Sequence, residues 1–426
     1  MTIPLAAPFP FPRHCRFILS AAGRSWSLGL ALLLALAPAR VQGQTQPSIS
    51  MQSVAGSSNL LFQLNTQSNW FYTFQQSTNF TNWGYAADYY ASNTSLSWTN
   101  PITTNGAGAF FRVTVNAPNP AANTNYHSWA NSITINNGLV EAVIVPTIGR
   151  VQQFRFLGDT NNAFWEDPTL YGQSPSTSSY KGFGGNKAWP APQYGWATHW
   201  WPPPTGFDGT TETGSFTNGV VTLVSQTDSQ YGLHVTRTIE LLFNEPVMRI
   251  TTAFTRTAST SMITSNFGVW IDCQAAVTNT SRCYVPVPSP SIFANGYTLT
   301  GDAYFGPSLP VNFSNVNSLI SFGPDTAASH KVGFDSGTLI LVGTNLTLRI
   351  DAPRIAGLSY PAGGCSTEVY TAQYSSTSAY FELELLGPMS TLPVGGTMQA
   401  TTTYSLFHRT GPTDDAEAQK VLSWQY

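Results

Sequence analysis

The stretch that indicates the fold class reads Ser132-Ile-Thr-Ile-Asn-Asn-Gly-Leu-Val-Glu-Ala-Val-Ile-Val145. It holds two runs rich in β-branched residues, Ser132–Ile135 and Leu139–Val145, on either side of Asn136-Asn137-Gly138. An Asn-Gly pair between two such runs is a strong short-range signal for a β-hairpin, because asparagine and glycine tolerate the positive φ angles of the tight turn. The stretch is therefore predicted to form two antiparallel strands.

Similar strand-like runs continue to the end of the chain. They occupy Val220–Ser225, His234–Phe243, Val247–Arg256, Leu339–Val342, Leu346–Ile350, Glu368–Gln373, Tyr380–Leu386 and Thr397–His408. The one clear helix signal comes late, where Thr413 and Asp414 can cap a short helix through Ala416 to Leu422. No repeat of fixed period is present, which disfavours propellers and solenoids. We predict an all-β protein built on one large antiparallel β-sandwich.

Residues 1–43 have the order of a secretory signal peptide. Three arginines precede the apolar run Leu28–Ala37, and small residues follow it. That run is too short to span a bilayer, and no later run is longer. We therefore expect cleavage near Ala39 or Gly43 and a soluble product that is secreted, either periplasmic or extracellular.

The remaining chain is predicted to contain two β-domains. Residues 46–116 hold short alternating runs typical of a small β-sandwich, residues 117–125 form a Pro/Asn/Ala-rich linker, and residues 126–426 form the large sandwich. Within the first, Tyr72–Trp83 and Phe110–Val113 resemble a fibronectin-like accessory module of secreted proteins from environmental bacteria. This resemblance implies nothing about the ligand of the module.

Charge excludes several classes of partner. Without residues 1–43 the chain keeps 14 of its 18 Lys and Arg residues against 21 Asp and Glu, a net charge near −7. Nucleic acids and anionic lipids require clustered basic side chains, so neither is expected to bind. The low charged fraction of 9% leaves surfaces rich in hydroxyl and amide groups.

The pattern of cysteines and acidic residues indicates neither a cofactor nor a metal site. Cys273, Cys283 and Cys365 remain after the leader, so at most one disulfide can form, and Cys273 with Cys283 is the plausible pair. Three scattered cysteines without nearby histidines do not make a zinc site, and no dense acidic loop indicates calcium. We expect neither a metal ion nor a cofactor.

The segment Gly184–Pro204 concentrates aromatic residues among prolines and glycines. Its tryptophans are Trp189, Trp196, Trp200 and Trp201, and its only formal charge is Lys187. Proline removes backbone donors and glycine removes side-chain packing, so we predict an ordered loop rather than a helix or central strand. Flat indole faces suit the apolar faces of a sugar ring. Alternatively, these tryptophans fill a large β-core.

Several segments, taken in order, resemble galactose mutarotase-like proteins, in a branch without an assigned activity. They are Asn137–Val151, Asn161–Glu166, Gly184–Trp189, Ser329–Gly333, Cys365–Thr371, Phe381–Pro388 and Leu392–Gly396. The resemblance covers residues 126 to about 410. It implies a large antiparallel β-supersandwich with a carbohydrate cleft on its concave face, and site residues that include a late carboxylate and a mid-chain histidine.

Glu368 matches the late carboxylate of that family. Aldose epimerisation needs a base that removes the anomeric hydroxyl proton and an acid that protonates the ring oxygen. Glu368 begins a strand-like run, has no lysine or arginine nearby in sequence, and would gain a raised pKa if aromatic residues buried it. The alternative is an exposed glutamate at the end of a strand.

The acid partner departs from the family pattern. The corresponding region, Gly268–Gln274, contains no histidine, which puts epimerase activity in doubt. We expect His199, between indoles, to substitute for it, although it could simply hydrogen-bond the loop backbone. Lys331, beside His330 in a family-like segment, is the other candidate partner of Glu368.

Polar residues around these positions are expected to bind sugar hydroxyls. The set is Asn186, Lys187, Asp272 and Gln274. Arg150 either holds the glycine-arginine turn or contacts substrate, and the sequence leaves this open. Glu382 and Glu384 alternate on one strand face, which suggests the paired carboxylates of a glycosidase, but we interpret them as ordinary positions on one sheet face.

Together these features predict a secreted carbohydrate-active protein that binds a sugar or polysaccharide in an aromatic-lined cleft. Acid/base catalysis of the epimerase, lyase or hydrolase type is the first hypothesis. A non-catalytic glycan-binding protein and a structural envelope protein are the alternatives. Sequence motifs of serine hydrolases, phosphate-binding enzymes and zinc proteases are absent. The sugar, the reaction and the number of subunits stay open.

Overall fold

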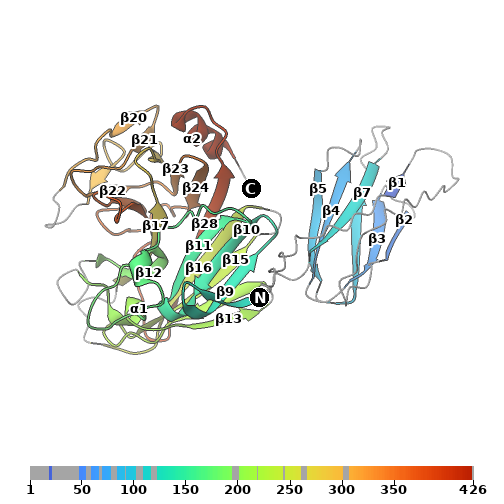
Figure 1. The fold of residues 1–426 in the computed structure, drawn as a ribbon, viewed down its shortest axis with the longest axis horizontal. Coiled ribbons are helices and arrows are strands. Elements are labelled where there is room, and N and C mark those ends of the chain that lie inside the picture. The colour runs from blue at the N-terminus through green and yellow to red at the C-terminus, as the bar shows by residue number, and fades with distance from the viewer. Residues whose placement is uncertain are drawn as a thin grey trace, which may run out of the picture. The chain divides into compact units, whose positions relative to one another are not determined.

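The structure is a computed structural model that describes most of the chain. The described residues are 19–21, 48–53, 59–66, 70–77, 84–91, 93–101, 109–116, 122–193, 201–217, 219–242, 245–260, 266–300 and 307–424. The chain divides into two compact units, residues 1–120 and 121–426, and antiparallel strands dominate both (Figure 1).

The N-terminal unit contains two small sheets. One has the strand order β1 (Leu19–Ala21), β7 (Ala109–Asn116), β4 (Trp70–Ser77) and β5 (Gly84–Ala91), and the other has β2 (Ile49–Ser53), β3 (Asn59–Asn65) and β6 (Ser95–Pro101). Buried aromatic rings join the two sheets: the Trp98 ring lies 4.8 Å from Phe62 and 4.3 Å from Phe74. Strand β1 lies within the segment expected to be a signal peptide, and cleavage of that segment stays a prediction.

Two large sheets form the C-terminal unit. The eleven-stranded sheet has the order β19 (Thr298–Leu299), β22 (His330–Phe334), β25 (Thr367–Thr371), β26 (Tyr380–Leu386), β17 (Asn266–Ala276), β12 (Gly185–Ala191), β11 (Arg150–Phe156), β10 (Val140–Val145), β9 (Trp129–Asn136) and β8 (Ala122–Tyr126), with β27 (Ser390–Thr391) paired to β17. The ten-stranded sheet has the order β13 (Thr213–Thr217), β14 (Val220–Val224), β15 (Leu233–Leu241), β16 (Val247–Arg256), β28 (Thr397–His408), β24 (Leu346–Asp351), β23 (Thr338–Val342), β18 (Arg282–Pro286), β21 (Leu319–Phe322) and β20 (Ser314–Val316). The predicted all-β fold class is confirmed.

The hairpin predicted from Asn136-Asn137-Gly138 is present. Strands β9 and β10 pair antiparallel with Asn136 opposite Glu141, and Gly138 takes a φ of 87°. The Asn137 side-chain oxygen accepts the backbone N–H groups of Leu139 and Val140 at 3.0 and 2.9 Å. The turn residues therefore fix the register of the first large hairpin.

Helical structure is sparse in the part of the chain that the structure describes. It comprises α1 (Thr205–Asp208), α2 (Asp414–Ser423) and two 3-10 turns, Pro146–Ile148 and Pro168–Leu170. The predicted C-terminal helix is confirmed, because the Thr413 hydroxyl caps α2 by accepting the N–H of Ala416 at 3.2 Å. Neither described α-helix has the length and hydropathy needed to cross a membrane.

Residues Gly185–Ala191 correct one expectation, because they form the central strand β12 rather than a loop. Strand β12 pairs with β17 along its whole length, but with β11 only at Val151–Asn186. Pro190 lies beyond that single pair with β11, so its missing N–H breaks no bond of the β11–β12 ladder. The second half of the tryptophan segment, from Trp201 to Pro204, does lie outside regular strands.

A buried polar network lies between the two large sheets. Asn186 on β12 donates a side-chain N–H to the Tyr404 hydroxyl on β28 at 2.7 Å, and Thr402 donates to the same oxygen at 3.2 Å. Arg237 on β15 donates to the Asn186 carbonyl at 3.1 Å and to its side-chain oxygen. These hydrogen bonds connect the two sheets across the core that lies between them.

The cysteines also differ from expectation. Cys273 and Cys283 are buried free thiols on different large sheets, and Cys365 is a third. The pairing considered for Cys273 and Cys283 is therefore not present. In both strands the thiol packs in the apolar core as a small hydrophobic side chain.

Replacing Tyr404 by phenylalanine tests the buried network. The change removes the acceptor of the Asn186 and Thr402 donors, so the free energy of unfolding should fall by about 1–3 kcal/mol. Tyr374→Phe is the matched control, since the Tyr374 hydroxyl bonds to no described residue, and it should change stability by less than about 0.5 kcal/mol. Equal stability of the two variants in urea unfolding would show that the network does not stabilise the fold.

Candidate functional site

One face of the eleven-stranded sheet carries a line of charged side chains. Residues directly opposite one another on neighbouring strands share a sheet face. Lys187 lies opposite Asp272, Asp272 opposite Glu384, and Glu384 opposite Glu368. Arg150 extends the line, one residue beyond the Val151–Asn186 pair. We call these five residues the charged row.

A second line runs parallel to it, two residues along each strand. Gln274 lies opposite Glu382, Glu382 opposite Tyr370, and Tyr370 opposite Lys331. We call Gln274, Glu382, Tyr370 and Lys331 the second row. Both rows project from the sheet face that points away from the core between the sheets.

Ion pairs connect the rows. The Lys187 ammonium lies 2.9 Å from a carboxylate oxygen of Asp272. The Lys331 ammonium lies 3.1 Å from Glu368 and 3.0 Å from Glu384, so one lysine serves two carboxylates. All five side chains are nearly inaccessible to solvent, with exposed fractions between 0 and 11%.

Two of the carboxyl groups here, those of Glu382 and Glu384, have raised pKa values. Burial, followed by the charge of Asp272, raises the pKa of Glu382 to about 7. Burial also raises the pKa of Glu384 well above its ordinary value, although Lys331 opposes the shift. Glu382 is therefore close to half-protonated at neutral pH. Among the residues that the structure describes, no His, Cys, Asp and Glu cluster is arranged to hold a metal ion.

Among the acidic residues of the two rows, Glu382 is the one that is partly exposed. Its carboxylate accepts a hydrogen bond from the Gln274 amide at 2.8 Å. A pocket of about 400 Å³ opens on the same sheet face, lined by Ser329, Tyr370, Ala372, Gln373, Tyr374, Ser375, Ser378 and Tyr380. Tyr370 lies opposite Glu382 on the neighbouring strand, and Tyr380 precedes Glu382 by two residues on β26, so two residues that line the pocket are neighbours of Glu382 on the sheet, although Glu382 is not itself a lining residue.

Aromatic rings line the other end of the charged row. Trp189 lies opposite Trp270 with ring centres 5.3 Å apart, and Trp201 packs edge-on against Trp189 at 5.8 Å. The Lys187 ammonium lies 4.0 Å from the centre of the Trp189 ring, and the Lys331 ammonium 4.7 Å from that of Trp270. These cation–π contacts help to keep both lysines charged despite burial.

The structure separates the predicted tryptophans. Trp189 is 1% exposed and has no ring surface available to a ligand. Its position fits the alternative interpretation, in which the tryptophans fill the β-core. Trp201 is 38% exposed and can still stack on a ligand. Trp196, Trp200 and His199 lie outside the described residues, and their roles stay predictions.

Glu368 needs correction in one respect. The sequence shows no basic residue near it, but the sheet register brings Lys331 from β22 beside it. Its exposed fraction of 5% removes the alternative of an exposed strand end, and the ion pair removes the free carboxylate expected of a base. Glu368 and Lys331 do share one site, as predicted partners should.

Two other residues that were predicted to bind sugar hydroxyls or substrate, Asn186 and Arg150, instead stabilise the fold. Asn186 points into the core between the sheets, because it alternates with Lys187 along β12, and it cannot reach a ligand on the opposite face. Arg150 is buried, donates to the Gly184 carbonyl at 2.9 Å and pairs with Asp208. It therefore holds the turn that begins β12, which is the first of the two roles considered for it.

That turn requires glycine. Gly184 has a φ of 86°, and a Cβ there would lie 2.1 Å from the Trp165 carbonyl oxygen. The Gly184-Gly185 pair thus lets segment 165–166 cross β12 closely, and Gly185 donates its N–H to the same carbonyl at 2.8 Å. Lys187 is positioned two residues further on.

Glu382, Glu384, Tyr370 and Trp270 belong to the site although the sequence analysis did not assign them to it. Two glutamates alternating within an otherwise apolar strand, Tyr380–Leu386, were the available signal. Charged side chains on the buried face of a strand require partners, and these partners come from strands remote in sequence.

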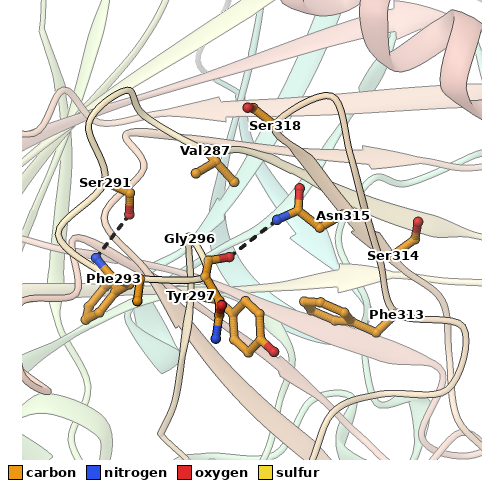
Figure 2. Close-up of a pocket in the computed structure, with 11 residues that line it drawn as sticks. Val287, Ser291, Phe293, Gly296, Tyr297, Phe313, Ser314, Asn315 and Ser318 are labelled. Atoms are coloured by element: carbon orange, nitrogen blue, oxygen red, sulfur yellow. Dashed lines mark hydrogen bonds between the residues drawn. The ribbon is translucent and has the colours of Figure 1, made fainter.

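A second and larger pocket, of about 650 Å³, lies apart from both rows (Figure 2). It is lined by Val287, Ser291, Phe293, Ala294, Asn295, Gly296, Tyr297, Phe313, Ser314, Asn315 and Ser318. The Asn315 amide donates to the Asn295 carbonyl at 3.3 Å across the pocket, and the Tyr297 and Phe313 rings lie 4.9 Å apart. None of these lining residues is charged, so the pocket suits binding rather than acid/base chemistry.

Comparison with known proteins gives similarity at the level of structure alone. No protein-family model matches the chain. No curated protein matches it. Solved structures to which the chain is similar include a galactose mutarotase-like protein from Lactobacillus casei ATCC 334, at 14% identity and TM-score 0.42 over 65% of this chain and 100% of that one. YeaD from Salmonella typhimurium has 10% identity and TM-score 0.43 over 65% and 90%. The GH36 α-galactosidase AgaA from Geobacillus stearothermophilus has 10% identity and TM-score 0.36 over 65% and 41%.

The raised pKa of Glu382 predicts a pH dependence of stability. Between about pH 4.5 and pH 7 the folded state binds a proton at Glu382 that the unfolded state has released, so the free energy of unfolding falls as pH rises through this window. Glu382→Gln removes this contribution. Its urea midpoint should therefore fall less between pH 5 and pH 8 than that of the wild type.

Other buried carboxyl groups remain in both proteins, so the difference isolates Glu382. Glu240→Gln, which changes a glutamate in an exposed pair with Arg249, is the control and should retain the wild-type pH dependence. A Glu382→Gln variant with the wild-type dependence would contradict the raised pKa.

Proposed function

We propose that this protein binds an uncharged sugar in the pocket beside Glu382 and transfers a proton to or from a sugar oxygen through that carboxyl group. The observation that carries the proposal is a partly exposed carboxyl with a pKa of about 7 next to two tyrosines, Tyr370 and Tyr380, that line an open pocket. A group with this pKa can act as acid or base at neutral pH without a large thermodynamic penalty.

The pocket lining supports a sugar as the ligand. Its volume of about 400 Å³ falls within the range of small-molecule sites. Serine hydroxyls, the Gln373 amide and the faces of Tyr370, Tyr374 and Tyr380 match the hydroxyl edges and apolar faces of a pyranose. No lining residue is charged, which favours a neutral ligand over a uronic acid or a phosphorylated sugar.

The neighbours of Glu382 define what it can do. Gln274 orients its carboxyl group, and Lys187 and Lys331 supply positive charge that stabilises oxygen anions forming nearby. Glu384 and Glu368 are held by Lys331 and leave no second free carboxylate for glycoside hydrolysis. This arrangement favours proton transfer of the epimerase type, with His199 as the predicted partner.

Export to the periplasm or the extracellular space belongs to the proposal, and it rests on the leader-like residues 1–43. A surface low in charge and rich in hydroxyl and amide groups suits a carbohydrate partner outside the cell, and the acidic net charge disfavours nucleic acid.

Glu382→Gln tests the catalytic proposal. In a panel of reducing sugars followed by polarimetry, the variant should lose at least about 100-fold in kcat, because a general acid/base contributes roughly 10²- to 10⁴-fold. Sugar binding, followed by tryptophan fluorescence, should change less than about threefold, since the amide keeps the shape of the carboxyl. The wild-type kcat/KM should titrate near the pKa of about 7.

Glu240→Gln is the matched control and should behave as the wild type. Retention of full turnover by Glu382→Gln would remove Glu382 from catalysis. Absence of turnover in the wild type on every sugar tested, with binding retained, would favour the alternative below.

Glycan binding without turnover is the second candidate, and the uncharged pocket in Figure 2 favours it. Under this alternative Tyr297→Ala should weaken binding of a neutral oligosaccharide by about tenfold or more, since stacked rings contribute about 0.5–1.5 kcal/mol beyond their buried area. Glu382→Gln should leave that binding unchanged. Isothermal titration of both variants distinguishes the two sites.

A further inference from the structure

Ser308, His330 and Asp325 form a continuous hydrogen-bonded chain. The Ser308 hydroxyl lies 2.9 Å from His330 Nδ1, and His330 Nε2 lies 2.9 Å from Asp325 Oδ2. His330 and Asp325 are almost fully buried, whereas Ser308 is exposed. The hydrogen bonds thus connect a nucleophile to a base and the base to a group that orients it. Of the three, only the nucleophile faces solvent.

The carboxylate fixes the tautomer of the imidazole. The pKa of Asp325 is lowered: burial opposes the shift, but the N–H of Ala327 and the bond from His330 outweigh it, so the group is ionised and accepts hydrogen bonds only. In the neutral imidazole, the proton therefore resides on Nε2 and the Nδ1 lone pair faces Ser308. The serine must donate its proton to that lone pair, as a nucleophilic serine does to its base.

The side chains of this hydrogen-bonded chain belong to neither row, although the Asp325 backbone pairs with Gln373 and Tyr374, which line the pocket near Glu382. His330 and Lys331 are adjacent on β22, so their side chains project to opposite faces of the sheet. His330 lies on the side of Val332 and Phe334, while Lys331 binds Glu368 and Glu384 on the other. Neither row contains a member of the serine, histidine and aspartate chain.

The surroundings of Ser308 indicate the kind of substrate. Residues 307–313 contain no charged side chain, and Pro307 and Leu309 flank the serine with apolar surface. The backbone N–H groups of Ser308 and Leu309 bond to no other residue that the structure describes, and N–H groups at and next to a nucleophile have the position that stabilises an oxyanion. These features suit an uncharged carboxylic ester.

We propose that Ser308, His330 and Asp325 form an acyl-transfer site that hydrolyses short-chain, uncharged carboxylic esters. The Ser308 oxygen attacks the ester carbonyl carbon as its proton moves to His330 Nδ1. Collapse of the tetrahedral intermediate breaks the bond to the alcohol oxygen, which takes that proton and leaves. Water then attacks the acyl-serine with His330 again as base, releasing the acid and restoring the serine.

The lack of a Gly-x-Ser-x-Gly sequence does not count against this assignment. That motif belongs to one strand-turn-helix arrangement, whereas catalytic serine constellations on unrelated folds share only their geometry. A purely structural role, in which the three groups anchor residues 307–313 to the sheet, predicts the same distances but no reactivity. Reactivity is therefore the property to measure.

The first experiment is labelling of the folded full chain with a fluorophosphonate probe, followed by peptide mass spectrometry. Ser308 should carry the adduct, and Ser308→Ala should lose it. Ser359→Ala, which changes an exposed serine that lines neither pocket, is the control and should label as the wild type does. Hydrolysis of p-nitrophenyl acetate should fall at least tenfold in Ser308→Ala and stay unchanged in Ser359→Ala.

A cysteine variant keeps the test decisive if turnover is slow. In Ser308→Cys, His330 should draw the proton from the thiol, so iodoacetamide should alkylate the new thiol at least tenfold faster than the one in Ser359→Cys. The wild-type chain is the blank, because its described cysteines are all buried. Unlabelled Ser308 together with equal alkylation rates in the two cysteine variants would overturn the proposal.

Discussion

Lys331 holds two buried carboxylates, Glu368 and Glu384, on one face of the eleven-stranded sheet. Burying charges is costly unless each has a partner, and here one ammonium serves two acidic groups while Lys187 serves Asp272. Glu382 is the carboxyl left without a lysine of its own. Burial, followed by the charge of Asp272, raises its pKa, and its position next to residues that line an open pocket gives that pKa a chemical use.

Strand alternation explains why neighbouring residues have unrelated roles. Along β12, Asn186 joins the polar network between the sheets and Lys187 joins the charged row. Along β17, Cys273 packs in the core between two residues of the site, Asp272 and Gln274. Along β22, His330 and Lys331 serve two separate clusters. One strand thus contributes to the core and to a site at once.

The sequence contained the components of the site but not their pairing. Lys187, Asp272, Gln274, Lys331 and Glu368 were expected near a ligand, and the structure gathers them on one sheet face. Glu382 was set aside because alternation alone cannot distinguish an exposed sheet face from a buried one. Asn186 was included for its polarity, since nothing local indicates which face of β12 it occupies.

Local chemistry was sufficient for the all-β class, the Asn137-Gly138 hairpin and the capped helix at Thr413, because each depends on residues a few positions apart. The ion pairs of Lys331, the chain from Ser308 to Asp325 and the orientation of β12 could be decided only by the tertiary fold. They depend on the register between strands distant in sequence, and a shift of one residue would move each of these side chains to the opposite face.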